Sequence, residues 1–129
     1  MSTIAAVATP DAVGGISVIR ISGEKSLEIA DKIFKNYAGK APSQMDGYTC
    51  AYGQIINDNN EKIDDVVLTV FRNPKSYTGE DVVEVSCHGG RYITKKILRM
   101  IYKYGAEPAQ GGEFTKRAFL NGKMSLTQA

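Results

Sequence analysis

Short hydrophobic stretches, several with alternating polar residues, recur along the chain and are bounded by turn-forming residues. A period of two places neighbouring side chains on opposite faces of a strand. The pattern predicts strands at residues 3–9, 15–22, 48–56, 62–71 and 82–87. The polar turn 57–61 separates the third and fourth of these stretches, which are therefore expected to form a hairpin with a longer loop.

A helix is predicted over residues 23–36, because apolar residues recur there at helical spacing. Its apolar face consists of Leu27, Ala30, Ile33, Phe34 and Tyr37. Ser22 is placed to cap the N-terminus of this helix, and Gly39 lies past its end. The segment is thus expected to be an amphipathic helix that covers the sheet.

A second amphipathic helix is predicted over residues 91–104. The inward residues are Ile93, Ile97, Ile101 and Tyr104, and the outward residues are Lys95, Arg99 and Lys103. Residues 114–120 add an apparent helical turn. The order of strands and helices predicts an α+β fold, a two-layer sandwich in which helices cover one face of a mainly antiparallel sheet.

Length and composition are those of a single globular domain, with 129 residues, 43% hydrophobic and 23% charged. The apolar runs are far too short to cross a bilayer and no signal pattern opens the chain, so we expect a cytoplasmic protein with no membrane contact. Cys50 and Cys87 have no partners at metal-binding spacing and are expected to be reduced, half-buried thiols. His88 is the only histidine, which excludes a cluster of histidine metal ligands.

Positive charge is concentrated at the end of the chain. Residues 1–90 hold 8 Lys/Arg and 12 Asp/Glu, whereas residues 91–129 hold 8 and 2. The basic segment fits an anionic ligand or RNA, and it fits equally a helix face in contact with solvent. A phosphate-binding loop is absent, because Arg117 and Met124 stand where that motif needs glycine and Ser/Thr around Gly122 and Lys123. Lys123 by itself is either a solvated lysine or a cation in a pocket.

Two charged residues lie within predicted strands. Arg20 shares a strand face with Ile16 and Val18, so it is either on a solvated edge or directed at an anionic group. Glu84 lies between valines and needs donors if it is buried. Arg20 and Glu84 either pair with each other across the sheet or belong to a pocket in which a ligand satisfies both.

The last five residues predict the start of another helix. Ser125 and Gln128 have the spacing of a capping box, and a helix of four residues is not stable in water. We therefore expect one domain over residues 1–124 and the truncated start of a following helical domain over residues 125–129.

Four stretches, "TIAAVATP", "GGISVIRISG", "SYTGEDVVEVSCHGG" and "GEFTKRAFLNGKMSLTQA", resemble in order and spacing the N-terminal domain of the MnmE (TrmE) family of tRNA modification GTPases. The resemblance runs from Thr3 to Ala129. It implies a folate-binding α+β domain that is similar to half of the aminomethyltransferase fold and that forms a homodimer. The residues that match the family's folate contacts are Arg20, Glu84 and Lys123, and the implied cofactor is a tetrahydrofolate derivative of the 5-formyl or methylene type.

The resemblance also implies a longer parent protein. That protein continues into a helical domain with an inserted GTPase domain, which binds GTP, Mg²⁺ and K⁺, and it works with a flavoprotein of the MnmG (GidA) type. Together they place an aminomethyl-type group on the wobble uridine of tRNA. This chain lacks the GTPase domain and is expected to have no GTPase activity, and the alternative is an RNA-contacting module that uses the basic C-terminal third. An aromatic-rich strand typical of an RNA-recognition sheet is absent from residues 82–87.

Overall fold

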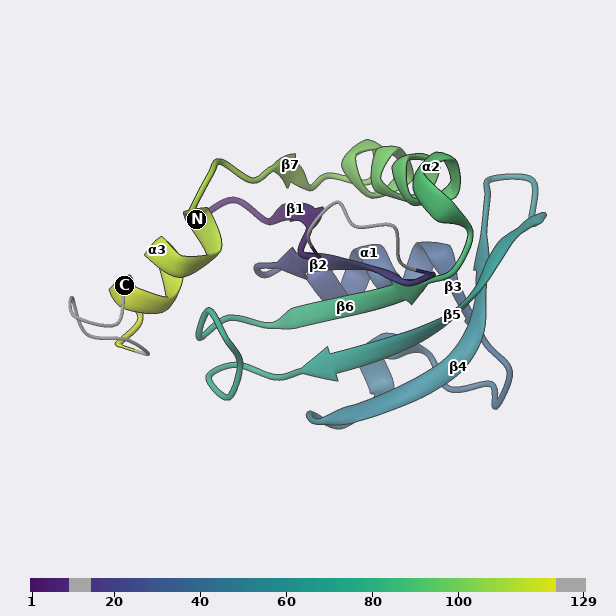
Figure 1. The fold of residues 1–129 in the computed structure, drawn as a ribbon. Helices are drawn as coiled ribbons and strands as arrows, with labels where there is room; N and C mark the ends of the chain where they lie inside the picture. Colours follow the sequence, from purple (N-terminus) through teal and green to yellow (C-terminus); the bar gives the residue numbers. More distant parts are fainter. Residues whose placement is uncertain (10–14, 123–129) are drawn as a thin grey trace.

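A computed structural model describes residues 1–9 and 15–122, and these form one mixed sheet with helices packed on it (Figure 1). The strand order is β3-β4-β5-β6-β2-β1-β7, and every pair is antiparallel except β1 with β7. The strands are β1 (Ile4–Val7), β2 (Ser17–Ser22), β3 (Phe34–Asn36), β4 (Thr49–Ile56), β5 (Lys62–Phe71), β6 (Val82–Cys87) and β7 (Glu107–Pro108). The helices are α1 (Ser26–Ile33), α2 (Gly90–Lys103), α3 (Glu113–Leu120) and the 3-10 turn η1 (Pro42–Gln44). The α+β prediction is confirmed.

The hydrophobic core lies between one face of the sheet and the helices α1 and α2. Side chains of β2, β6 and β5 that point to this face are fully buried, for example Ile19, Val85 and Leu68. They meet Ile29 of α1 and Ile97 of α2 in one cluster. The opposite face, called the open face below, therefore carries the residues at the alternate positions of the same strands.

The first predicted helix ends earlier than expected. Residues Phe34–Asn36 form β3, which pairs with β4 at the edge of the sheet. Gly53 permits this close pairing, because a Cβ there would lie 2.6 Å from the Phe34 ring and closer still to the Lys35 carbonyl oxygen. Phe34 is buried as predicted, but Tyr37 lies beyond the helix and is exposed. A partner distant in sequence thus overrides the local helical pattern.

The predicted cap of this helix is also wrong. Lys25 occupies the N-cap position of α1, and no side chain caps the helix there. Ser22 is fully buried instead and its hydroxyl bonds to Thr78 and Glu80. The Ser26 hydroxyl donates to the Gly23 carbonyl oxygen in the turn before the helix.

The second predicted helix is confirmed as α2. Ile97 and Ile101 are buried, and Ile93 and Tyr104 are partly buried. The outward residues are Lys95, Arg99 and Lys103, and all three are exposed. Lys103 forms an ion pair with Asp58 in the β4–β5 turn.

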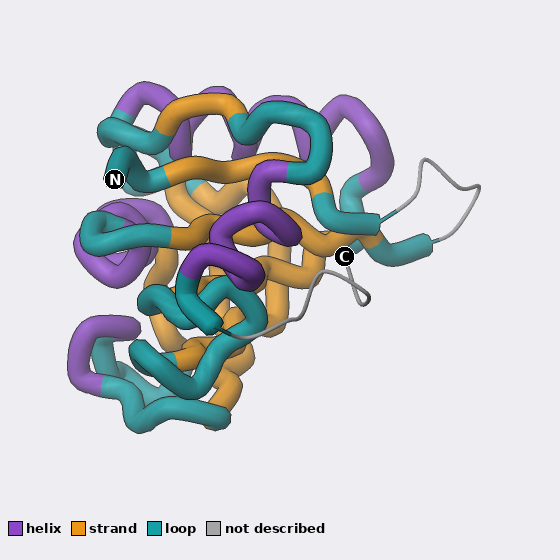
Figure 2. Tube along the Cα trace, turned by 90° about the vertical axis from the view of Figure 1, so that its left-hand side faces the viewer, coloured by secondary structure: helices purple, strands orange, loops and turns teal. Residues whose placement is uncertain are grey.

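Helix α3 departs from the expected arrangement of helices on one face. It lies at the end of the strands, near the N-terminus and apart from α1 and α2 (Figure 1). Viewed from that side, α3 is the helix in front of the strand ends (Figure 2). Phe114, at its start, reaches Arg20 on the open face. Helix α3 therefore contributes to the surface opposite the main core.

The expectation that both thiols are half-buried is wrong, because one is exposed and the other is buried. Cys50 is exposed on β4, whereas Cys87 is buried at the end of β6. Burial raises the pKa of the Cys87 thiol to about 11. Its thiol donates to the Ser17 carbonyl oxygen at 3.4 Å.

The two thiols are expected to react with Ellman's reagent at very different rates near pH 8, because only exposed thiolate is an effective nucleophile. One equivalent should react quickly in the folded protein, and the second only after denaturation. Replacing Cys50 with serine should abolish the fast phase and replacing Cys87 should leave it intact. A fast phase that disappears with Cys87→Ser instead would contradict the burial of that thiol.

No helix in the described ranges 1–9 and 15–122 is long and apolar enough to cross a membrane. The predicted domain boundary at residue 124 and the helix start at 125–129 lie outside the described residues.

Candidate functional site

Arg20 and Glu84 lie directly opposite each other on the neighbouring strands β2 and β6. Arg20 Nε donates to Glu84 Oε2 at 2.8 Å. The side chains are 22% and 25% exposed, so the pair is neither buried nor fully solvated. The cross-strand pairing considered from the sequence is therefore present in the structure.

The register explains why both charges face away from the core. Ile19 and Ile21 flank Arg20 on β2, and Val83 and Val85 flank Glu84 on β6, and all four are fully buried. Since neighbouring residues of a strand point to opposite faces, Arg20 and Glu84 must both lie on the open face. Because the hydrophobic residues of both strands occupy the core face, the charged pair is left on the open face.

Two aromatic rings flank the Arg20 guanidinium. Its Cζ lies 5.0 Å from the ring centroid of Tyr77 and 5.3 Å from that of Phe114, which is cation–π distance. Tyr77 belongs to the loop before β6 and Phe114 to α3, and the Tyr77 hydroxyl is 3.0 Å from Thr115 Oγ1. The charged pair is therefore partly covered by groups from two separate segments, the loop before β6 and α3.

The pair retains hydrogen-bonding capacity toward a ligand. Among the described residues, Arg20 Nε is the donor found for the Glu84 carboxylate, and the Arg20 Nη groups have no acceptor. A carboxylate accepts paired N–H donors in one plane, and a guanidinium donates to carboxylates or carbonyl oxygens. With two rings within cation–π distance of the guanidinium, this set suits a flat, polar, partly anionic molecule.

Lys123, the third predicted site residue, lies outside the described residues. The last described residue is Gly122, two residues after the end of α3. Its contribution to the site therefore stays a prediction.

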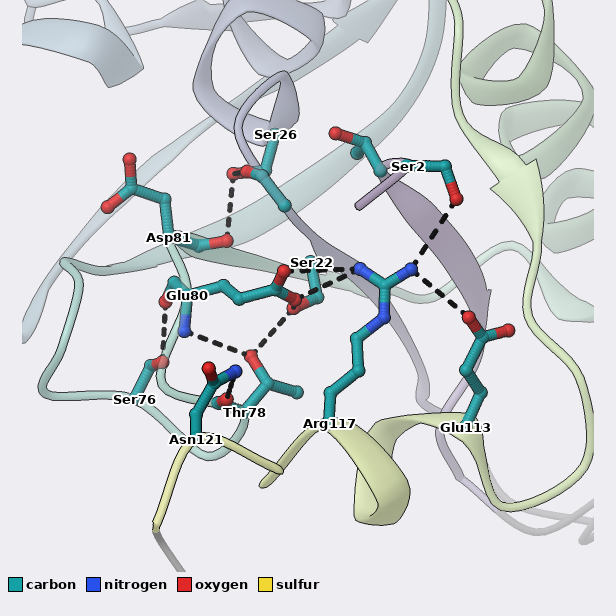
Figure 3. Close-up of polar contacts among 12 residues, drawn as sticks. Ser2, Ser22, Ser26, Ser76, Thr78, Glu80, Asp81, Glu113, Arg117 and Asn121 are labelled. Carbon is teal, nitrogen blue, oxygen red and sulfur yellow. Dashed lines mark hydrogen bonds and ion pairs between the residues drawn. The ribbon is translucent and has the colours of Figure 1, made fainter. Parts of the chain in front are cut away.

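A buried ion cluster beside this site was not predicted from the sequence (Figure 3). Arg117 of α3 is only 2% exposed. Its Nη1 contacts both carboxylate oxygens of Glu80 at 3.1 and 3.2 Å, and its Nη2 contacts Glu113 at 3.1 Å and Ser2 Oγ at 3.5 Å. Arg117 Nε is buried without an acceptor among the described residues. One guanidinium thus joins the N-terminus, the loop before β6 and the start of α3.

The electrostatics of the cluster favour the charged form of Glu113. The Gln110 backbone N–H donates to Glu113 Oε1 at 2.9 Å and, together with Arg117, holds the pKa of Glu113 below its ordinary value. Glu113 and Arg117 have i,i+4 spacing, which indicates a helical ion pair and was available in the sequence. The link to Glu80, 37 residues away along the chain, left no such signal.

The basic residues of α2 lie away from Arg20 and Glu84. Helix α2 packs on the core face of the sheet, whereas the charged pair is on the open face. Lys103 is already paired with Asp58. The RNA-contacting alternative stays a prediction that no contact of this site supports.

A hollow of about 490 Å³ lies at the edge of the sheet formed by β3 and β4. Its walls include Cys50, Lys40 and the adjacent rings of Tyr37 and Tyr52, whose centroids are 5.2 Å apart. Neither Arg20 nor Glu84 lines it. The charged pair with its flanking rings is therefore the better candidate for specific recognition.

Comparison with known proteins gives consistent matches over the whole described domain. Residues 3–123 match the family model described as "GTP-binding protein TrmE N-terminus". The chain is 52% identical over 130 residues to "tRNA modification GTPase MnmE" of Parabacteroides distasonis, covering 100% of this chain and 28% of that protein. The protein of the same name from Clostridioides difficile is 51% identical over 127 residues, covering 98% of this chain and 28% of the relative.

The chain thus spans little more than a quarter of the length of these relatives. The family match covers both described site residues and the α3 segment that surrounds them. Since the family model is that of an N-terminal region and nearly every residue is matched, the chain belongs to the MnmE (TrmE) family of tRNA modification GTPases, as its N-terminal domain.

Proposed function

We propose that this domain binds a tetrahydrofolate derivative at the Arg20–Glu84 pair and forms a homodimer. The observation that carries the proposal is the partly exposed ion pair with two aromatic rings within cation–π distance of its guanidinium. Cation–π contact stabilises an ion pair of any role, but an ion pair that only joined two strands would not need to keep hydrogen-bonding groups free beside two rings. A pterin, by contrast, is flat, presents paired N–H donors and carries a glutamate tail.

Each side chain has a distinct role in this proposal. Glu84 accepts the paired N–H donors of the pterin ring through its carboxylate. Arg20 donates to a ring carbonyl or to the carboxylate tail, and Tyr77 and Phe114 provide apolar contact with the flat ring system. Lys123 is proposed as a further cation for the tail. A folate bound here would supply a one-carbon unit to a reaction elsewhere in the longer protein.

The open face supports a second copy of the chain as partner. It exposes Ile16 and Tyr52, and Val18 and Val67 on the same face are only partly buried. In the described part of the chain, neither α1 nor α2 covers this face. A symmetric dimer buries the same patch on both copies, which is the commonest arrangement in soluble oligomers.

The remaining functions are proposed for the longer protein. Its GTPase domain, with GTP, Mg²⁺ and K⁺, and its flavoprotein partner of the MnmG (GidA) type would together modify the wobble uridine of tRNA. The names of the relatives, "tRNA modification GTPase MnmE", support the GTPase and tRNA-modification parts of this proposal. The predicted cytoplasmic location fits such a role and stays a prediction.

Calorimetric titration of this chain with 5-formyltetrahydrofolate is the direct test. We expect saturable binding with one site per chain, and sedimentation at micromolar concentration should give the mass of a dimer. A GTP analogue serves as the control ligand and should not bind, because the chain has no phosphate-binding loop. Absence of saturable folate binding would contradict the cofactor proposal, and a monomeric mass would contradict the dimer.

A further inference from the structure

We propose that Arg117 is a positioning residue for the Arg20–Glu84 site. Its buried guanidinium holds together the two segments that carry Tyr77 and Phe114, so that both rings flank Arg20. The contacts of Arg117 are those of the structure itself, whereas their effect on folate binding rests on the proposed function.

The two carboxylates held by Arg117 are close in sequence to the two rings. Glu113 immediately precedes Phe114, and Glu80 follows Tyr77 by three residues in the same short loop. Both carboxylates lie about 3 Å from the one guanidinium, Glu80 at Nη1 and Glu113 at Nη2. Arg117 is therefore the buried link between the two ring-bearing segments, beside the Tyr77–Thr115 contact at their surface.

The cluster is also attached to the strand that carries Arg20 (Figure 3). The Ser22 hydroxyl donates to Glu80 Oε1 at 2.7 Å and lies 2.7 Å from Thr78 Oγ1. Ser22 is two residues after Arg20, on the same face of β2, and it is fully buried. The loop is thereby fixed against β2 at a point about 7 Å from the Arg20 backbone.

A second contact locks the loop to the other end of α3. The Asn121 amide donates to the Thr78 carbonyl oxygen at 2.8 Å. Gly79 has a φ of +81°, and a Cβ there would lie 2.7 Å from Asn121 Cβ. Because loop and helix are held at both ends, the orientation of Phe114 relative to Tyr77 is fixed once Arg117 is in place.

The planar arrangement of donors in the guanidinium is needed for this role. Arginine presents donors in a rigid plane and contacts two carboxylates at once, whereas a lysine ammonium is a point charge on a flexible stem. Buried ion networks are often no more stable than well-packed apolar residues of similar volume. Arg117 Nε is buried without an acceptor among the described residues, so the guanidinium does not use its full hydrogen-bonding capacity there.

The test compares Arg117→Lys with the wild type by nuclear magnetic resonance, without folate. The Arg20 Nε–H donates to Glu84 and is enclosed by two rings, whose ring currents should displace its proton signal upfield. The signal is assigned by its loss in Arg20→Lys. In Arg117→Lys we expect it to move downfield, and the affinity for 5-formyltetrahydrofolate to fall about five- to tenfold as two side chains lose their ordered positions.

Arg99→Lys, at an exposed position on α2, is the matched control and should change neither signal nor affinity. If Arg117→Lys does not fold, Glu113→Gln, which frees the α3 side of the cluster, decides the question with the same two readouts. A folded variant with an unchanged Arg20 signal would overturn the positioning role, and so would a displaced signal with undiminished folate affinity. A displaced signal in a protein whose wild type binds no folate would support the positioning and contradict the proposed function.

Discussion

Replacing Arg117 with methionine is expected to lower the free energy of unfolding by about 3 kcal/mol. Methionine fills a similar volume but leaves the carboxylates of Glu80 and Glu113 facing each other without a cation. Removing one partner of a buried ion pair usually costs more than this, but the two carboxylates are 17% and 20% exposed and retain some water. Urea denaturation measures the loss, and thermal unfolding should show a midpoint lower by about 10 °C.

Two variants serve as controls for this prediction. Arg99→Met, at the exposed face of α2, should change stability by no more than about 0.5 kcal/mol. Adding Glu80→Gln and Glu113→Gln to Arg117→Met should recover part of the loss, because the uncompensated charges are then gone. A loss below about 1 kcal/mol for Arg117→Met would contradict the view that this cluster fastens α3 to the domain.

The loss should also depend on pH, with a sign that follows from the shifted pKa. The pKa of Glu113 is lowered in the folded protein, first by the Gln110 N–H and then by Arg117. Its charged form therefore stabilises the fold above the unfolded pKa, and this contribution disappears as the pH falls through the lowered folded pKa. The difference in stability between wild type and Arg117→Met is expected to be full near neutral pH and to shrink in acid.

Replacing Glu84 with glutamine is expected to weaken the binding of 5-formyltetrahydrofolate by about 1.5 to 3 kcal/mol, or roughly ten- to a hundredfold. Glutamine keeps the size of the side chain but offers one acceptor oxygen and a donor where the pterin requires two acceptors. The stability should fall by no more than about 1 kcal/mol, because the pair with Arg20 is partly exposed and screened by water. Calorimetric titration and thermal unfolding of the same protein measure both quantities.

The matched control is Glu28→Gln, which alters an exposed carboxylate on α1 and should affect neither folate affinity nor stability appreciably. Arg20→Gln should behave like Glu84→Gln. If Glu84→Gln lowered stability by about 3 kcal/mol and left folate affinity unchanged, the pair would be a structural ion pair and the site assignment would be wrong. Loss of affinity with a nearly unchanged midpoint is the result expected of a binding residue.

Local periodicity alone determined much of the secondary structure. The apolar residues of α2 recur at helical spacing and its cations occupy the other side, as the structure confirms. The strand 82–87 and the hairpin on either side of residues 57–61 were likewise predicted from alternation and turn residues. These features are readable because burial of one face imposes a short repeat on the residues themselves.

Pairing between distant segments overrode local pattern in two places. Residues Phe34–Asn36 continue the helical spacing of α1, yet they form β3 because β4 offers a free edge with Gly53 at the point of contact. Ser22 has the chemistry of a helix cap, yet Thr78 and Glu80 take its hydroxyl. A side chain that suits two roles can be assigned to one of them only when its neighbours in the fold are known.

The candidate site, too, was predicted in part from the sequence and was completed only by the tertiary structure. The sequence by itself determined that Arg20 and Glu84 are charges on otherwise apolar strands, and it left open whether they pair across the sheet, face solvent or bind a ligand. Only the tertiary structure decided that β2 and β6 are neighbours in matching register, that Tyr77 and Phe114 both lie within cation–π distance of Arg20, and that Arg117 joins their segments. The physical reason is that periodicity reports the face on which a residue lies, whereas the identity of the residue facing it depends on how distant segments pack.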